Sequence, residues 1–356
     1  MPTTEEIRSA WNNMAAYFER WAEPGSTLVA QSLLFLMRLE EAADMLEVGG
    51  GAGATARLAR GYLPAGARLV VTDLSSEMVA RARVKNPDLQ IEEADAEHLP
   101  FADGSFDRYL ASLNLMIVAD PDAALREAYR VLRPGGIAAF SVWGRRSRSP
   151  MMTIQERAVQ RVGLELPLAD RSNFHLSSRR KLSRKLRRAG FDHLRLWRQQ
   201  MILPFKDSKD FAEKMMASAP RLVAALSRAE PERQAHFQRL VERMAARVLD
   251  SERPIGLEVL LVIAQKPLEG ESLDGDLGFG RDEANEPEEL SSAEAEAAED
   301  VPAPKAPTED LPAGEAPTEE GSPYAEPPIP DDDGPDSVDD EPAAAREDSG
   351  RSGDAP

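Results

Sequence analysis

Short apolar runs alternate with amphipathic segments along the first 145 residues of the chain. The apolar runs have the length of buried strands, and the segments between them carry apolar residues at helical spacing. The pattern predicts strands at 43–48, 68–72, 89–92, 106–111 and 137–142, and helices at about 54–62, 76–85 and 121–132. Alternating strands and helices imply a parallel sheet with right-handed crossovers, whose ligands bind at the carboxyl edge of the strands.

Residues at the expected helix ends support this assignment. Thr3 and Glu6 have the spacing of a capping box, which predicts a helix at the N-terminus. Asp120 followed by Pro121 is typical of a helix start. The stretch 133–136, Arg-Pro-Gly-Gly, is expected to end that helix, because glycine accepts left-handed geometry.

Beyond residue 145 the pattern predicts a mixed region. Its expected elements are a basic amphipathic helix at 178–189, a strand at 193–203, a helical stretch at 207–250 interrupted near Pro220 and Pro231, and a last strand at 256–265. We expect the helices between the last two strands to choose the substrate.

A glycine-rich stretch, Glu47-Val48-Gly49-Gly50-Gly51-Ala52-Gly53, stands where a strand is expected to turn into a helix. Glycine leaves the backbone open to close approach, and the amides of such a turn suit a nucleotide or a carboxylate. Asp73 ends the next apolar run, and we expect it at an exposed strand end where it accepts hydrogen bonds from ribose hydroxyls. Because glycines 49 and 51 with Ala54 also fit the dinucleotide fingerprint, the loop alone leaves an NAD(P) site open.

Charge divides the chain into two unlike parts. The net charge is −19 over 356 residues, but residues 268–356 hold 29 acidic and 4 basic residues, a net charge of −25. That segment also holds 13 of the 27 prolines, so we expect a disordered acidic tail. The remaining 1–267 carries a net charge of +6 and is long enough for one sizeable domain.

The chain has no cysteine, which excludes disulfides, thiolate nucleophiles and cysteine-ligated metals. It shows neither a signal-peptide pattern at the N-terminus nor an apolar run of about 18 residues. We therefore expect a cytoplasmic protein without a membrane span.

Four segments resemble the class I S-adenosylmethionine (SAM) methyltransferases, in particular the small-molecule branch that includes the ubiquinone/menaquinone biosynthesis methyltransferases. They are EVGGGAG at 47–53, VVTDLSSEMVARAR at 70–83, DAEHLPFADGSFD at 95–107 and DPDAALREAYRVLRPGG at 120–136. The resemblance implies an α/β, Rossmann-like methyltransferase fold: a mostly parallel seven-stranded sheet with helices on both faces. Within the domain 1–267 it implies a helical cover at about 1–40, a SAM-binding core at about 41–145 and a substrate or lid region at about 146–267, before the tail at 268–356.

The resemblance also implies which residues bind SAM. The glycine loop would pass the methionine part, Asp73 would bind the ribose, and Asp95 would bind the adenine amino group. The whole expected set is Tyr17, Glu47, Gly49, Gly50, Gly51, Gly53, Asp73, Leu74, Asp95, Ala96 and Asn114. Tyr17 resembles the aromatic cover that the family places over SAM, although core packing explains such an aromatic equally well. No metal is expected.

The catalytic group is less clearly marked. SAM is already an activated methyl donor, so the enzyme mainly aligns a nucleophile with the methyl group. Many relatives have a histidine pair where Met116 and Ile117 stand here, so an obvious general base is missing. Asn114 and His175 are the remaining candidates, and each also has a purely structural explanation, as a buried loop amide and as a histidine at a helix entry.

These observations together predict a SAM-dependent methyltransferase that acts on a small-molecule acceptor. The alternatives are an NAD(P)-binding Rossmann oxidoreductase and a non-catalytic SAM-binding interaction protein. The segment 171–198 carries ten basic residues and one acidic residue. We interpret it first as a solvated helix face, next as a surface that contacts the acidic tail, and last as a nucleic-acid site, because no aromatic-rich RNA motif accompanies it.

Overall fold

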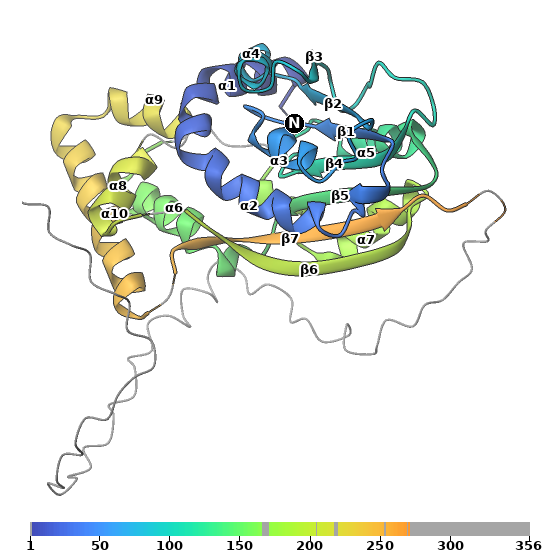
Figure 1. Ribbon diagram of the computed structural model, residues 1–356. Coiled ribbons are helices and arrows are strands. Elements are labelled where there is room, and N and C mark those ends of the chain that lie inside the picture. The colour runs from blue at the N-terminus through green and yellow to red at the C-terminus, as the bar shows by residue number, and fades with distance from the viewer. Residues whose placement is uncertain are drawn as a thin grey trace, which may run out of the picture. The chain divides into compact units, whose positions relative to one another are not determined.

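The computed structural model describes residues 2–165, 171–203, 205–216, 220–252, 254–268 and 270, and these lie in one compact unit, residues 1–299 (Figure 1). Apart from Leu268 and Gly270, the predicted disordered tail lies outside the described residues. Within the described ranges, no helix is both long and apolar enough to cross a membrane.

A seven-stranded sheet forms the centre of the fold, with the strand order β3-β2-β1-β4-β5-β7-β6. The strands are β1 (Asp44–Val48), β2 (Arg68–Asp73), β3 (Gln90–Glu93), β4 (Phe106–Ser112), β5 (Leu132–Trp143), β6 (Asp192–Ile202) and β7 (Gly256–Gln265). Strands β1 to β5 pair in parallel, and β7 pairs antiparallel with both β5 and β6. The predicted mostly parallel sheet is therefore confirmed.

Helices flank this sheet, and short helical turns connect several of them. The longer helices are α1 (Thr4–Tyr17), α2 (Glu23–Leu34), α3 (Ala54–Arg60), α4 (Ser76–Lys85), α5 (Pro121–Val131), α6 (Pro150–Val162), α7 (Arg179–Arg188), α8 (Ser208–Met216), α9 (Pro220–Arg228) and α10 (Pro231–Asp250). The turns are a π-helical turn, η1 (Phe18–Ala22), and the 3₁₀ turns η2 (Leu39–Glu41), η3 (Arg146–Arg148) and η4 (Asn173–Leu176). The predicted capping box at Thr3 and the predicted interruptions at Pro220 and Pro231 are all present.

The two faces of the sheet bury separate apolar cores. On β1, Met45 belongs to one core and Leu46 to the other, and on β2 Leu69 and Val70 divide in the same way. Adjacent residues of a strand point to opposite faces, so this division places helices on both faces, as predicted. The first core takes its helical residues from α2, α3, α4, α6, α8, α9 and α10, and the second from α5 and α7.

The stretch 133–136 follows the end of helix α5 as expected, since α5 ends at Val131 and Gly135 has a left-handed φ of +79°. The predicted start of the next strand at 137 is wrong, because β5 already begins at Leu132 and includes this stretch. The backbone is already extended at Leu132, and the segment finds hydrogen bonds beyond β7: the Gly135 amide donates to the Lys266 carbonyl at 2.8 Å, and the Lys266 amide donates to the Gly136 carbonyl at 2.9 Å. Pairing with the end of the domain therefore extends β5 back through the proline–glycine stretch.

Two glycines provide a matched test of the packing between α5 and β6. Gly190 has a φ of +103°, and a Cβ there would lie 2.7 Å from the ring of Tyr129, whereas Gly163 has a φ of +66° and open space around it. We expect Gly190→Ala to destabilise the fold by about 1–3 kcal/mol more than Gly163→Ala, since both carry the left-handed penalty and only the first overpacks. Urea unfolding of the two variants measures this difference, and equal losses would contradict the contact.

Candidate cofactor site

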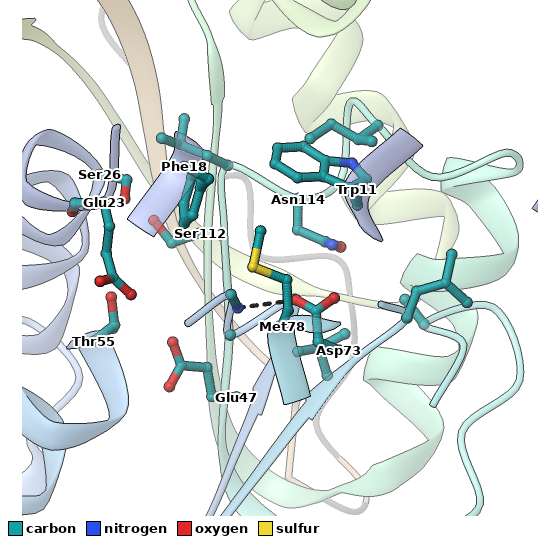
Figure 2. A pocket seen from close by; sticks show the side chains of 18 of the residues that line it. Trp11, Phe18, Glu23, Ser26, Glu47, Thr55, Asp73, Met78, Ser112 and Asn114 are labelled. Atoms are coloured by element: carbon teal, nitrogen blue, oxygen red, sulfur yellow. Dashed lines mark hydrogen bonds between the residues drawn. The ribbon is translucent and has the colours of Figure 1, made fainter. Parts of the chain in front are cut away.

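A cavity lies at the carboxyl edge of the parallel strands, between the N-terminal helices and the ends of β1, β2 and β4 (Figure 2). The residues lining it are Ile7, Trp11, Phe18, Glu23, Ser26, Glu47, Val48, Gly49, Gly50, Gly51, Thr55, Asp73, Leu74, Met78, Ala94, Ala96, Ser112, Leu113, Asn114 and Ile117. Segments that are distant in the sequence thus converge where open α/β sheets bind their ligands.

The glycine loop after β1 is open because side chains do not fit there. Gly49 and Gly51 have φ values of +68° and +57°. A Cβ on Gly49 would lie 2.3 Å from the amide nitrogen of Asn114, and a Cβ on Gly51 would lie 2.9 Å from the ring of Phe18. Both the backbone conformation and the close approach therefore require glycine at these two positions.

Asp73 fixes this loop to the end of β2. One carboxylate oxygen accepts a hydrogen bond from the Gly51 amide at 2.9 Å, and the other accepts from the Ser75 amide at 2.9 Å. The residue is half-buried rather than exposed, which corrects the expected exposed strand end, and burial raises the pKa of its carboxyl group despite these bonds. Asp73 therefore shapes the loop as well as lining the cavity, as the dashed bond in Figure 2 shows.

Two further carboxyl groups line the same cavity. Glu47 is buried, and its Oε2 has no hydrogen-bond partner in the described part of the chain. Burial, followed by the charges of Asp73 and Glu23, raises the pKa of Glu47 to about 8. Glu23 accepts a hydrogen bond from the Ala54 amide at 3.2 Å and pairs with Lys85. An uncompensated carboxyl group of this kind suits a cavity that takes up a cation.

The aromatic side chains over the cavity are Trp11 and Phe18, which meet edge to face with their ring centroids 5.6 Å apart. Tyr17 is not among the lining residues. Its hydroxyl donates to the Lys214 carbonyl at 3.2 Å, and burial raises its pKa to about 12. Phe18 begins the π-helical turn, which inserts a residue into the helical repeat and changes which side chains point inward.

Polar contacts with α4 hold these N-terminal helices in place. Glu19 pairs with Arg81 and with Lys85, the latter at 3.0 Å, and Lys85 also pairs with Glu23. The Ser75 hydroxyl donates to the side-chain oxygen of Asn12 at 2.6 Å. The helices α1 and α2 therefore cover the cavity and are held against α4 by these contacts.

The other expected cofactor residues divide into two groups. Gly50, Leu74, Ala96 and Asn114 line the cavity, together with Glu47, Gly49, Gly51 and Asp73. Gly53 and Asp95 do not. Gly53 precedes α3 in a left-handed conformation and its carbonyl accepts from Asn86 at 3.0 Å, while Asp95 accepts from the Glu97 amide at 2.9 Å, between the lining residues Ala94 and Ala96.

The two catalytic candidates are in different surroundings. Asn114 lines the cavity and follows Leu113, a non-glycine residue with a φ of +52° whose amide donates to the buried Ser141 hydroxyl at 2.9 Å. His175 is not among the lining residues, and its Nε2 is buried without a hydrogen-bond partner in the described chain. Burial, with Arg171 and other nearby cations, lowers the pKa of His175 to about 4, so this imidazole is neutral at physiological pH. Among the described residues, no three ligand-type side chains cluster to hold a metal.

Sequence reasoning missed several lining residues. Trp11 and Phe18 are seven residues apart, two helical turns, and this spacing could have paired them. No comparable sequence pattern marks Glu23 as a lining residue. Its position depends on the fold, which brings α2 against the start of α3.

Comparison with known proteins identifies the family. A family model described as a methyltransferase domain matches residues 46–140. Malonyl-[acyl-carrier protein] O-methyltransferase of Geobacter sulfurreducens is 32% identical over 193 residues, which cover 52% of this chain and 70% of that protein. The chain belongs to the class I SAM-dependent methyltransferases. The resemblance inferred from the four sequence segments is thereby confirmed.

Other known proteins are also similar to this chain. The Pectobacterium atrosepticum protein with the same name as the Geobacter relative is 33% identical over 165 residues, 46% of this chain and 64% of that protein, so the chain spans about two thirds of the length of these relatives. A demethylmenaquinone methyltransferase of Renibacterium salmoninarum is 32% identical over 144 residues, 40% of this chain and 58% of that protein. Among solved structures, the MccD protein matches with a TM-score of 0.47 at 18% identity, covering 68% of this chain and 98% of that chain.

The raised pKa of Glu47 predicts how the ligand-free methyltransferase responds to pH. Between the ordinary glutamate pKa of 4.5 and about 8, the unfolded chain loses the proton of Glu47 that the folded chain keeps, so stability falls as pH rises through this window. We expect Glu47→Gln to stabilise the protein by about 1–3 kcal/mol at pH 8, and by much less near pH 5. Urea unfolding at the two pH values measures the gain.

Glu258 is the matched control for this substitution. It is buried in β7, but hydrogen bonds and the charges of Arg145 and Arg198 outweigh its burial and hold its pKa below the ordinary range. Glu258→Gln should therefore destabilise the protein at pH 8. A loss of stability in Glu47→Gln at pH 8 would contradict the uncompensated state of that carboxyl group.

Proposed function

We propose that this chain transfers the methyl group of SAM to a small-molecule acceptor. The observation that carries the proposal is a cavity, at the carboxyl edge of a methyltransferase sheet, that combines the glycine loop with Asp73 and the unpartnered Glu47. SAM carries a sulfonium, an ammonium and a carboxylate group, so its net charge is positive. A cavity whose described lining holds three carboxyl groups and neither lysine nor arginine fits a ligand of that charge. The bound cofactor supplies an activated methyl group.

Each part of the cavity has a proposed role toward the cofactor. Asp73 accepts hydrogen bonds from the ribose hydroxyls while its amide contacts keep it in place. Glu47 binds the ammonium group, whose positive charge compensates the buried carboxylate. Trp11 and Phe18 pack on the adenosyl part and exclude water from it, and the segment from Asp95 to Ala96 borders the adenine.

The acceptor has to bring its own nucleophile. Among the described residues, the ionisable side chains that line the cavity are Glu23, Glu47 and Asp73, with no histidine, lysine or tyrosine. Glu23 is occupied by Lys85 and the Ala54 amide, and the other two face the proposed cofactor. We therefore propose an acceptor that reacts as an anion. Asn114 orients that acceptor or the cofactor, and the chain accelerates transfer by alignment rather than by removing a proton.

Methyl-labelled SAM incubated with the full chain and a fractionated cell extract tests the function. We expect label in a small-molecule product identified by mass spectrometry. Asp73→Asn, which keeps the side-chain shape, should lower the rate at subsaturating SAM by about 10- to 100-fold, because charge-assisted hydrogen bonds are worth roughly 1.5–3 kcal/mol. Binding of SAM without transfer to any fraction would favour the non-catalytic alternative, and label confined to protein or RNA would refute the small-molecule acceptor.

A pair of neighbouring aromatics tests the cover. Phe18→Ala should raise the dissociation constant for S-adenosylhomocysteine by about 10-fold or more, since burying such a ring is worth roughly 1.5–3 kcal/mol. Tyr17→Phe removes only the hydroxyl that bonds to the Lys214 carbonyl and should leave this constant unchanged. Calorimetric titration measures both. The opposite ranking of the two variants would restore Tyr17 as the residue that covers the cofactor.

A further inference from the structure

Helix α7 presents a dense positive surface. Seven of its ten residues are basic, while Leu182 and Leu186 are buried in the core beneath it. We define the basic face as the exposed cationic residues of this helix, Arg180, Lys181, Arg184, Arg187 and Arg188. Like charges at helical spacing repel one another, so this face is destabilising unless anions neutralise it.

The described part of the chain does not neutralise the basic face. Lys185, which is half-buried on the same helix, pairs with Asp122 at 2.7 Å, and Arg179 donates to the Leu196 carbonyl at 3.1 Å. None of the five residues of the basic face forms an ion pair with any described residue. The face therefore offers five cationic groups to an anionic partner.

The chain leaves the described fold beside this helix. Strand β7 ends at Gln265, which pairs with Asp192, four residues after the last residue of α7. The sequence that follows, 269–299, holds 12 acidic residues and a single basic residue, Arg281. A ten-residue helix is about 15 Å long, and an extended chain advances about 3.3 Å per residue, so this acidic segment is long enough to pass along the whole helix.

We propose that the acidic segment 269–299 binds the basic face of α7 in the same chain. Charge complementarity supplies the attraction, and attachment a few residues away gives the segment a high effective concentration that an external ligand lacks. The basic face carries no aromatic side chain on which nucleic-acid bases could stack, so a base-stacked single strand is disfavoured as its occupant. The segment thus acts as a built-in competitor that admits only strongly anionic partners to this surface.

Cross-linking of the full chain tests the contact. A zero-length carbodiimide reagent joins a lysine amine to a carboxylate that touches it, and Lys181 is the lysine of the basic face. At about 0.01 M ionic strength, where the Debye length is about 30 Å, we expect Lys181 to be joined to carboxylates of 269–299 several-fold more often than the exposed Lys206 and Lys209. At about 1 M, where that length is about 3 Å, the preference should disappear.

Two results of this experiment would overturn the proposal. Equal yields at Lys181, Lys206 and Lys209 would mean that the segment samples the surface without preference. A yield that falls in proportion to dilution would assign the contact to a second copy of the chain. A yield that is independent of protein concentration and lost at high salt supports the intramolecular contact.

Two matched sets of substitutions locate the contact on the helix. Replacing Arg180, Arg184, Arg187 and Arg188 by glutamine keeps helix propensity and the buried leucines, and should reduce the yield at Lys181 several-fold. The control replaces four exposed arginines of α10, Arg233, Arg239, Arg243 and Arg247, by glutamine. It should leave the cross-linking yield at Lys181 unchanged. Equal loss from both sets would refute a specific role of α7. Circular dichroism checks that each variant folds, and the salt dependence of the unaltered chain decides the question if one does not.

Discussion

The hydrogen bond between the Gly51 amide and the Asp73 carboxylate joins the two strand ends on which the site is built. It holds the loop after β1 against the end of β2, and the adjacent Gly50 amide bonds to the Thr72 carbonyl at 3.0 Å to complete the join. The same contact brings Asp73 near the buried Glu47 and raises its pKa, after burial itself. The bond that shapes the loop thus also brings a second carboxyl group close to the buried Glu47.

The N-terminal helices close that cavity and depend on the same loop. Phe18 reaches over Gly51 because glycine leaves room for its ring, and Glu23 accepts the first amide of α3, which the loop delivers. Both residues belong to the N-terminal helical segment, which ion pairs with Arg81 and Lys85 of α4 hold in place. A ligand in the cavity would therefore touch a surface assembled from the loop, the sheet edge and the cover together, which favours a ligand that is enclosed rather than one bound at an open edge.

The sheet and the residues at the strand ends could be predicted from the sequence. Glycines 49 and 51 and Asp73 follow local backbone preferences that hold at the carboxyl ends of strands in parallel sheets generally. The sequence did not predict the structure where contacts between residues far apart in the chain determine it. Phe18, rather than the expected Tyr17, lines the cavity, and its ring packs over Gly51 of the loop after β1. The pairing of 135–136 with Lys266 draws a proline–glycine stretch into β5. In both places the residue that makes the deciding contact lies far along the chain.

The central claim is that the cavity at the carboxyl edge is the site of an adenosyl methyl donor. Calorimetric titration of the full, unaltered chain with S-adenosylhomocysteine and, separately, with NAD tests it most directly. The account predicts saturable binding of one S-adenosylhomocysteine per chain and no heat with NAD, because the described lining of the cavity holds no lysine or arginine that would pair with a pyrophosphate. Binding of NAD without binding of S-adenosylhomocysteine would contradict it.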